Sequence, residues 1–525
     1  MRLAYKWQVA IVAALGLFMA ILDNTIVSVA LPQMMRAFST DLSTITWVVT
    51  GYFLAQAAII PVIGYLSDRI GTKRVFLVAL ALFTIGSGLC GLASNEKYLI
   101  IFRIIQGIGG GALFPIAFAI AFRVFPPTER GVASAIISVP VLLAPAFGPT
   151  IGGYLTTTFN WNAIFTINLP VGVLTLLLAF FILRNDEADA VDHTTSKGEM
   201  RPEARFDILG LVLAMVGFTA LVYGISEAST LGWGDRTVLA AMSGGCVILV
   251  AFVMTELRVG DPVLDVRLFF NSTFSLANFL IWVLMTFLFG SLFLLPSFFE
   301  NVQGQSPLSA GTYLIAQGLA AAVGVSIAGT LYNRIGPRIF ATIGFVLVTV
   351  GTFGLTQLTL STTGLSLQGW FILRGVGLGF VNIPLQTLAL SVVSNKAMAR
   401  ASSLMNVTRQ VFGAIGVAVL TTYLTQQVTN YGHDILAVIH KTPLTGIAAT
   451  CAPVLRKGAA QVQACITQQV APHGFNDTFT LAMIGCAICI VLALFVGRDR
   501  AVEAAKQATV SGESVEVKQP SLVAE

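Results

Sequence analysis

Charged residues are scarce in this chain. Only 10% of its 525 residues are Asp, Glu, Lys or Arg, whereas a soluble protein carries about 25%. So few charges cannot coat soluble domains of this total size, and this class is excluded. The deficit accompanies a 56% share of hydrophobic residues, gathered in runs of roughly 20 that suit membrane-spanning helices. The sequence therefore predicts an all-α integral membrane protein.

Residues for covalent chemistry are also few. A membrane enzyme needs clustered His, Cys, Ser or carboxylates at membrane depth, but all four histidines fall outside the predicted spans. We find no glycine loop for a nucleotide and no set of metal ligands. We therefore expect neither an enzyme, nor a metal, nor a bound cofactor. The net charge of +5 indicates anchoring at a membrane surface and not binding to nucleic acid.

The apolar runs predict fourteen spans. They lie at 8–31, 46–67, 75–93, 98–121, 131–156, 163–183, 207–226, 236–257, 273–299, 307–331, 339–357, 365–390, 402–427 and 478–497. An even number puts both termini on one side. Twenty-one of the 30 Lys and Arg residues fall on that side, six fall on the other, and three lie within spans. The excess of positive charge predicts cytoplasmic termini in a plasma or bacterial inner membrane.

The two ends of the chain resemble each other. GYLSDRIGTKR begins at Gly64 and the similar GTLYNRIGPR at Gly329, while GVASAIIS from Gly131 resembles ARASSLMN from Ala399. Arg103 and Arg374 each precede a glycine-rich stretch, and all three matches have nearly the same offset along the chain. Such parallel repeats are typical of transporters with a substrate site between the halves, and they fit a channel poorly.

The repeat predicts a division of the chain into two bundles of six helices with two inserted helices between them. The parts are an N-terminal bundle at 1–183, a cytoplasmic linker at 184–206, two inserted spans at 207–257, a C-terminal bundle at 273–497 with an outer loop at 428–477, and a cytoplasmic tail at 498–525.

Four motifs occur in order along the chain: LDNTIVSVALP at 22–32, GYLSDRIGTKR at 64–74, RIIQGIGGG at 103–111 and APAFGPTIGG at 144–153. Together they resemble the major facilitator superfamily, and within it the fourteen-span drug:proton antiporters. The resemblance implies export of small amphipathic or cationic drugs by alternating access, with the proton gradient as energy source. An exporter of an endogenous metabolite, lipid or siderophore, or an importer, stays open. Asn333 departs from the loop motif, because its counterpart in the first copy is Asp68.

Asp23 is the one acidic residue that we place deep within a span. A carboxylate there costs about 2.5–3.5 kcal/mol on insertion scales, and desolvation favours its neutral form. Such a group can take up a proton on one side and release it on the other. Arg103 shares a helix face with Gln106 and needs a carbonyl or carboxylate partner; the resemblance implies a role in the proton path. For both residues, a purely structural tie between helices is the alternative.

Two further motifs point to conformational change. The resemblance implies that the loop residues Gly64, Asp68, Arg69, Gly71, Lys73 and Arg74 form a cytoplasmic latch, although ordinary positive-inside charges are an alternative for the basic ones. The fifth predicted span carries Pro145, Gly148, Pro149, Gly152 and Gly153. Proline kinks helices and the glycine spacing permits close packing, and the resemblance links this motif to antiport.

The remaining candidates are polar residues and cysteines. Cavity-lining candidates are Asn24, Gln56, Gln106, Asn278, Gln317, Arg374, Asn382, Asn406, Arg409 and Gln410, with helix packing as the alternative. Cys451 and Cys465 share the outer loop and are predicted to form a disulfide in an oxidising space. The expected partners are the lipid bilayer and a small-molecule substrate, and the sequence leaves a periplasmic adaptor protein open.

Overall fold

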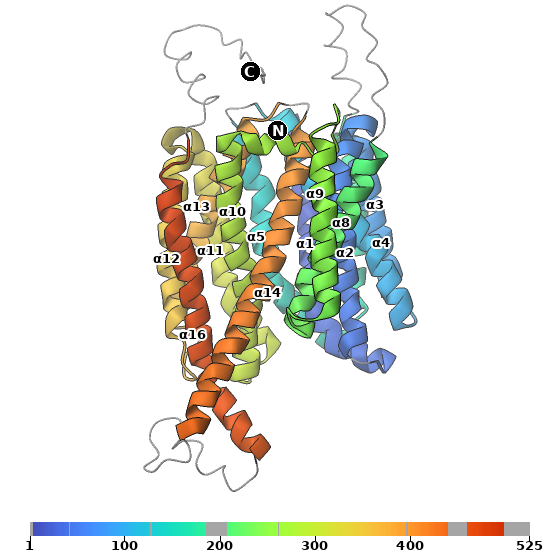
Figure 1. Ribbon diagram of the computed structural model, residues 1–525. Helices are drawn as coiled ribbons and strands as arrows, with labels where there is room; N and C mark the ends of the chain where they lie inside the picture. Colours follow the sequence, from blue (N-terminus) through green and yellow to red (C-terminus); the bar gives the residue numbers. More distant parts are fainter. Residues whose placement is uncertain are drawn as a thin grey trace, which may run out of the picture.

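The computed structural model describes residues 4–40, 42–126, 129–184, 207–260, 262–394, 397–438 and 459–497, and these residues are helical apart from short connections. Figure 1 shows long helices packed side by side, with their axes roughly parallel. Long apolar helices satisfy their own backbone hydrogen bonds, so they suit a hydrocarbon environment. The all-α membrane fold predicted from composition is confirmed.

The first half contains α1 to α7. Their bounds are α1 (Tyr5–Phe38), α2 (Leu42–Ile70), α3 (Thr72–Gly91), α4 (Glu96–Val124), α5 (Arg130–Thr158), α6 (Ala163–Thr166) and α7 (Asn168–Ile182). Two inserted helices follow, α8 (Ile208–Leu231) and α9 (Arg236–Glu256). Asp235 caps α9 by accepting hydrogen bonds from backbone N–H groups, which lowers the pKa of its carboxyl group.

The second half contains α10 to α16. Its helices are α10 (Ser272–Ser297), α11 (Pro307–Ile335), α12 (Pro337–Phe353), α13 (Gln368–Ser391), α14 (Met398–Val438) and α16 (Ala459–Ala493). Shorter segments are the 3₁₀ helices η4 (Val266–Phe270) and η6 (Gly354–Gln357) and the π-helix η5 (Phe298–Val302). Thirteen segments of the described chain are long and apolar enough to cross a membrane. The 29-residue helix α5 is not among them, so the predicted number of fourteen stays a prediction.

Two predicted boundaries differ from the structure. The outer loop expected at 428–477 is largely helical at both ends, because α14 continues to Val438 and α16 begins at Ala459. His473, expected in that loop, therefore lies on α16, with its ring 5.7 Å from that of Tyr431. The helices outlast the apolar pattern because backbone hydrogen bonding continues through polar residues outside the membrane. The linker 185–206 and the tail 498–525 lie outside the described residues.

The chain starts and finishes its helical part at the same end of the molecule. Figure 1 shows the first turn of α1 and the last turn of α16 at the top of the bundle, and we call this end the terminal face. The other end is the opposite face. Lys6 of α1 forms an ion pair with Glu129, the residue before α5, at the terminal face.

The repeat is visible in the backbone. Gly71 joins α2 to α3 with φ +93°, and Gly336 joins α11 to α12 with φ +90°, at the same offset as the two loop motifs. A residue with a Cβ rarely adopts this conformation, so both turns require glycine. The two halves therefore use the same tight turn at the terminal face.

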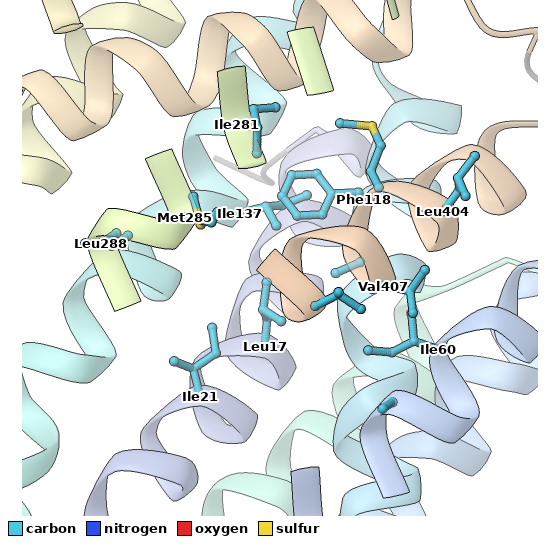
Figure 2. Packing of buried hydrophobic residues seen from close by; sticks show 14 of the residues in the cluster. Leu17, Ile21, Ile60, Phe118, Ile137, Ile281, Met285, Leu288, Leu404 and Val407 are labelled. Atoms are coloured by element: carbon cyan, nitrogen blue, oxygen red, sulfur yellow. The ribbon is translucent and has the colours of Figure 1, made fainter. Parts of the chain in front are cut away.

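The halves meet in an apolar core. Figure 2 shows Leu17 and Ile21 of α1 in one cluster with Met285 and Leu288 of α10. Ile281 of α10, Ile60, Phe118 and Ile137 of the first half, and Leu404 and Val407 of α14 complete the labelled group. Charged residues buried in the described structure are few, and the pair that lies deep in the first half, Asp23 and Arg103, marks the candidate site.

Candidate functional site

Asp23 and Arg103 form a fully buried ion pair. Asp23 lies on α1 and Arg103 on α4, and Nη1 of the arginine donates to Oδ2 of the carboxylate at 2.5 Å. The arginine Nε also donates to the backbone carbonyl of Val48 on α2 at 3.1 Å. The carbonyl and carboxylate partners that Arg103 was expected to need are therefore both present.

Two amide side chains complete the coordination of the carboxylate. Gln106 accepts from Arg103 Nη1 at 2.8 Å and donates to Asp23 Oδ1 at 2.9 Å. Asn168, at the start of α7, donates to the same Oδ1 at 2.8 Å and to the hydroxyl of Ser87 at 3.1 Å. Asp23 thus receives hydrogen bonds from three side chains, which is the arrangement that makes a buried ion pair tolerable.

Aromatic and sulfur groups enclose this network, which we call the Asp23 centre (Asp23, Arg103, Gln106, Asn168 and Ser87). The ring centroid of Tyr52 lies 4.1 Å from the guanidinium carbon of Arg103, a cation–π contact. Cys90 donates a weak hydrogen bond from its thiol to Gln106 at 3.6 Å. The sequence identified three members and missed Asn168 and Ser87, because a single polar residue in a span usually serves packing.

The glycines of α5 bring this helix against α1, next to Asp23. A Cβ on Gly148 would lie 1.9 Å from Thr25 Oγ1, and one on Gly152 would lie 3.1 Å from the carbonyl of Ile26. The helix runs unbroken from Arg130 to Thr158, so Pro145 and Pro149 do not end it; their side chains lie outside the described part. Gly153 is partly exposed. The motif therefore packs directly on the helix that carries the carboxylate.

The predicted latch lies at the terminal face, where the two halves touch. A Cβ on Gly64 of α2 would lie 2.8 Å from Cα of Arg400 and 2.9 Å from the carbonyl of Ala399, both on α14. A Cβ on Gly329 of α11 would lie 2.7 Å from the carbonyl of Gly131 on α5. Gly329 is the repeat counterpart of Gly64, and Gly131 that of Ala399. The two contacts are thus equivalent, and they join the halves at the terminal face.

Of the other latch residues, Arg69 lies beside the first contact. Arg69 lies over the ring of Tyr65, which also receives Arg400, at centroid distances of 5.3 and 5.5 Å. Lys73 lies 5.6 Å from the ring centroid of Phe180, and Arg74 is exposed. The side chain of Asp68 lies outside the described part, so its predicted role stays a prediction.

One element of the predicted repeat is out of register. A Cβ on Gly86 of α3 would lie 2.9 Å from Cβ of Gln106, and one on Gly351 of α12 would lie 2.7 Å from Cβ of Arg374. Gly351 is the counterpart of Gly86 at the offset of the loop motifs, so packing pairs Arg374 with Gln106 and not with Arg103. The sequence comparison paired Arg374 with Arg103. The close glycine contacts in the structure pair it with Gln106 instead, three residues or nearly one helical turn further along α4.

The cavity candidates separate by exposure. Asn24, Arg409 and Gln410 are partly exposed, whereas Gln56, Gln106, Asn278, Gln317, Arg374, Asn382 and Asn406 are buried. Gln410 donates across the halves to the carbonyl of Phe53 at 3.4 Å. Arg374 is enclosed within the second half, against Gly351 of α12 and near Cys486 of α16, so it does not line a passage between the halves.

The cysteines are partly described. Cys465 on α16 is disulfide-bonded, while Cys451 lies outside the described residues, so the predicted pairing stays a prediction. Cys90, Cys246, Cys486 and Cys489 are free thiols. Within the described residues, no group of three or more His, Cys, Asp or Glu side chains could hold a metal ion.

The amino-acid sequence is similar to those of known export proteins. The chain is 36% identical over 506 residues to a multidrug resistance protein B homolog of Mycobacterium tuberculosis, and the match covers 93% of this chain and 90% of the relative. It is 30% identical over 419 residues to the multidrug export protein EmrB of Escherichia coli, covering 79% and 80% of the two chains.

A solved structure matches the fold at low identity. The human organic anion transporter MFSD10 superimposes with a TM-score of 0.60 at 15% identity, covering 92% of this chain and 99% of that one. Such low identity shows the fold alone. A sequence model described as Major Facilitator Superfamily matches residues 13–417. With the two-bundle fold, the equivalent contacts at the terminal face and the motifs in order, this match shows that the chain belongs to the Major Facilitator Superfamily.

Proposed function

We propose that this chain is a proton-coupled antiporter that exports small amphipathic drugs, cationic compounds among them, by alternating access. The Asp23 centre carries the proposal. Its carboxylate is fully buried and is held by Arg103 at 2.5 Å, so it can bind a proton when this salt bridge breaks and release the proton when the salt bridge forms again. The names of the relatives, multidrug resistance protein B homolog and EmrB, support drug export.

Protonation of Asp23 changes the forces on α1. The ionised carboxylate draws α4 and α7 towards α1 through Arg103 and Asn168. A proton on Asp23 removes that charge and weakens both hydrogen bonds, because charge-assisted bonds are roughly twice as strong as neutral ones. Proton binding therefore loosens α1 from α4 and α7.

Helix α5 can transmit this change to the contact between the halves. It packs on α1 through Gly148, which meets Thr25 within one helical turn of Asp23, and it reaches α11 through Gly131 at the terminal face. A shift of α1 therefore moves one of the two glycine contacts that close this face. Opening one face and closing the other by a rigid shift of two bundles is the transition that alternating access requires.

We place the terminal face in the cytoplasm of a bacterial inner membrane, because the excess of Lys and Arg lies on that side. The closed terminal face then corresponds to an outward-facing state. The proton gradient supplies the energy, with no bound cofactor. The substrate enters from the cytoplasmic side or the bilayer and leaves on the opposite face in exchange for a proton.

Reconstitution into inside-out vesicles with an imposed pH gradient tests the proposal. We expect uptake of a cationic dye such as ethidium to follow the gradient and to stop when an uncoupler collapses it. Asp23→Asn is expected to abolish gradient-driven uptake while the protein stays folded in detergent. Uptake by the folded Asp23→Asn variant against a gradient would overturn the coupling role of Asp23.

A further inference from the structure

Arg409 lies on the face of α14 that looks towards the first half. Ser402, two turns earlier on the same helix face, donates to the carbonyl of Pro115 on α4 at 3.2 Å, so this face meets the other bundle. The neighbouring Gln410 donates to Phe53 of α2 at 3.4 Å. Arg409 is thus directed between α10 and α2, two turns beyond the contact of Ser402, and it is partly exposed there.

Among the described residues, no carboxylate pairs with the guanidinium of Arg409. Its one hydrogen bond within this part of the chain runs from Nη2 to the sulfur of Met285 on α10, 3.9 Å away. Thioether sulfur is a weak acceptor, whereas a guanidinium has five donors. A cation at this depth costs about 2.5–3.5 kcal/mol and calls for a negative partner.

The acidic side chains described in the first half are engaged or distant. Asp23 is held by Arg103. Glu129 pairs with Lys6 at the terminal face, and Glu96 begins α4 at the opposite face. Neither end of the bundle lies at the depth of Arg409, which is 11 residues, about three helical turns, inside the membrane-spanning part of α14 (398–432).

The second half offers no nearer carboxylate within its described part. Among the side chains described from α10 to α16, only Glu300 and Asp477 are acidic. Glu300 lies on η5 at the opposite face, and Asp477 accepts a hydrogen bond from Tyr431 at 2.7 Å. In the inserted helices, Asp207 and Asp235 cap the starts of α8 and α9, Glu256 ends α9 and accepts from the N–H of Val263 at 3.2 Å, and Glu227 lies near the end of α8. A counter-ion for Arg409 therefore comes from outside the described residues.

The residue that Arg409 contacts on α10 belongs to an apolar cluster. Figure 2 shows its contact residue Met285 beside Leu288 and Ile137, in the core cluster where the halves meet. A molecule that pairs with Arg409 therefore needs an anionic group for the guanidinium and an apolar body for these side chains.

We propose that Arg409 is the binding residue for the anionic group of amphipathic organic anions, carboxylates or sulfonates, which this transporter carries in addition to cations. The proposal rests on the export function proposed above and names part of its substrate range. The planar guanidinium pairs two of its N–H groups with two oxygens of the anion, which gives geometric selectivity that a lysine lacks. The Asp23 centre remains the proton site and does not contact the anion.

The test compares two dyes of opposite charge in the same vesicles. Pyrenesulfonate is a permanent anion with an apolar body, and ethidium is a permanent cation. We expect Arg409→Gln to reduce pyrenesulfonate transport by about tenfold or more, the loss of one charged bidentate pair, and to leave ethidium transport nearly unchanged. Arg409→Lys should recover part of the anion transport. Arg338→Gln, which removes an exposed arginine at the terminal face, should match the wild type for both dyes.

Equal loss of both dyes in Arg409→Gln, with an unchanged thermal midpoint, would overturn the inference, as would unchanged transport of pyrenesulfonate. Binding of pyrenesulfonate to the purified protein, measured by fluorescence anisotropy, separates this inference from the export function. If the wild type moves neither dye but binds pyrenesulfonate in an Arg409-dependent way, the export proposal fails and the anion site stands. Binding that is absent, or equal in Arg409→Gln, overturns the anion site.

Discussion

The two halves share a helix arrangement, but they differ in whether their buried arginines have a carboxylate partner. In the first half, Arg103 is neutralised by Asp23 and every member of the Asp23 centre has a hydrogen-bond partner. In the second half, Arg374 is buried with Nε and Nη1 unpartnered within the described structure, and Arg409 meets only a sulfur atom there. The first half thus neutralises its buried arginine, while the two arginines of the second half have no described carboxylate partner.

This contrast concerns the buried arginines and does not extend to the glycine contacts between the halves. At the terminal face the halves are alike, since Gly64 against α14 and Gly329 against α5 are equivalent contacts. The glycine contacts at the terminal face are duplicated, whereas the buried charges of the two halves differ. This arrangement suits an antiporter, because one conformational change must serve two different ligands. In the antiport proposed above, proton binding in the first half and substrate binding in the second compete through the shared contacts at the terminal face without sharing a residue.

The largest expected effect comes from breaking the ion pair of the first half. Arg103→Gln leaves the Asp23 carboxylate buried without its cation, and we expect the free energy of unfolding to fall by about 3–5 kcal/mol. The double variant Asp23→Asn/Arg103→Gln removes both charges and should recover most of that stability without recovering transport. Thermal unfolding in detergent, together with vesicle transport, measures both. A double variant as unstable as Arg103→Gln alone would show that the charges are not coupled.

Replacing Gly64 and Gly329 by a larger residue tests whether the halves are alike at the terminal face. Gly64→Leu and Gly329→Leu each force a side chain into a tight backbone contact, and overpacking costs about 1–3 kcal/mol. We expect both variants to depopulate the closed terminal face by about tenfold or more, and to similar extents. Distance measurements between spin labels on α2 and α14 report this population.

Gly244→Leu provides the control, because a Cβ at that position of α9 meets nothing within 4 Å. It should leave the labelled distance unchanged. A strong effect of Gly64→Leu with none of Gly329→Leu would show that the two contacts are not equivalent and that the contact of Gly64 alone holds the terminal face closed.

Removing the buried guanidinium of Arg374 in the second half should change the free energy of unfolding in the opposite direction to Arg103→Gln. Arg374→Gln relieves a guanidinium with two unpartnered buried nitrogens in the described structure, each a desolvation penalty of about 1–3 kcal/mol. We expect the free energy of unfolding to stay the same or rise. Arg374→Lys keeps the charge and should not stabilise. A large loss of stability in Arg374→Gln would reveal that the second half does neutralise this arginine.

The sequence predicted what depends on local pattern and missed what depends on packing. Span positions follow from apolar runs, and Asp23 and Arg103 stand out because charge is rare at membrane depth. Their pairing requires α1 to lie beside α4, and the contribution of Asn168 requires α7 beside both. The register of Arg374 depends on which residue Gly351 touches, and sequence matching alone misplaced it by nearly one helical turn.

The smallest effect that separates the halves concerns two asparagines. Asn168 donates to Asp23 Oδ1 and to Ser87, at 2.8 and 3.1 Å, so Asn168→Ala should cost about 1–3 kcal/mol because it strips a buried carboxylate of one donor. Asn278, equally buried on α10, bonds only the carbonyl of Phe274 on its own helix, and its Oδ1 is unpartnered within the described residues. Asn278→Ala creates a cavity of the same size without exposing a charge, so it serves as the matched control and should cost less. Thermal midpoints of the two variants give the difference directly. Equal losses would mean that cavity volume alone decides the outcome, and that the hydrogen bonds around Asp23 add no stability beyond packing.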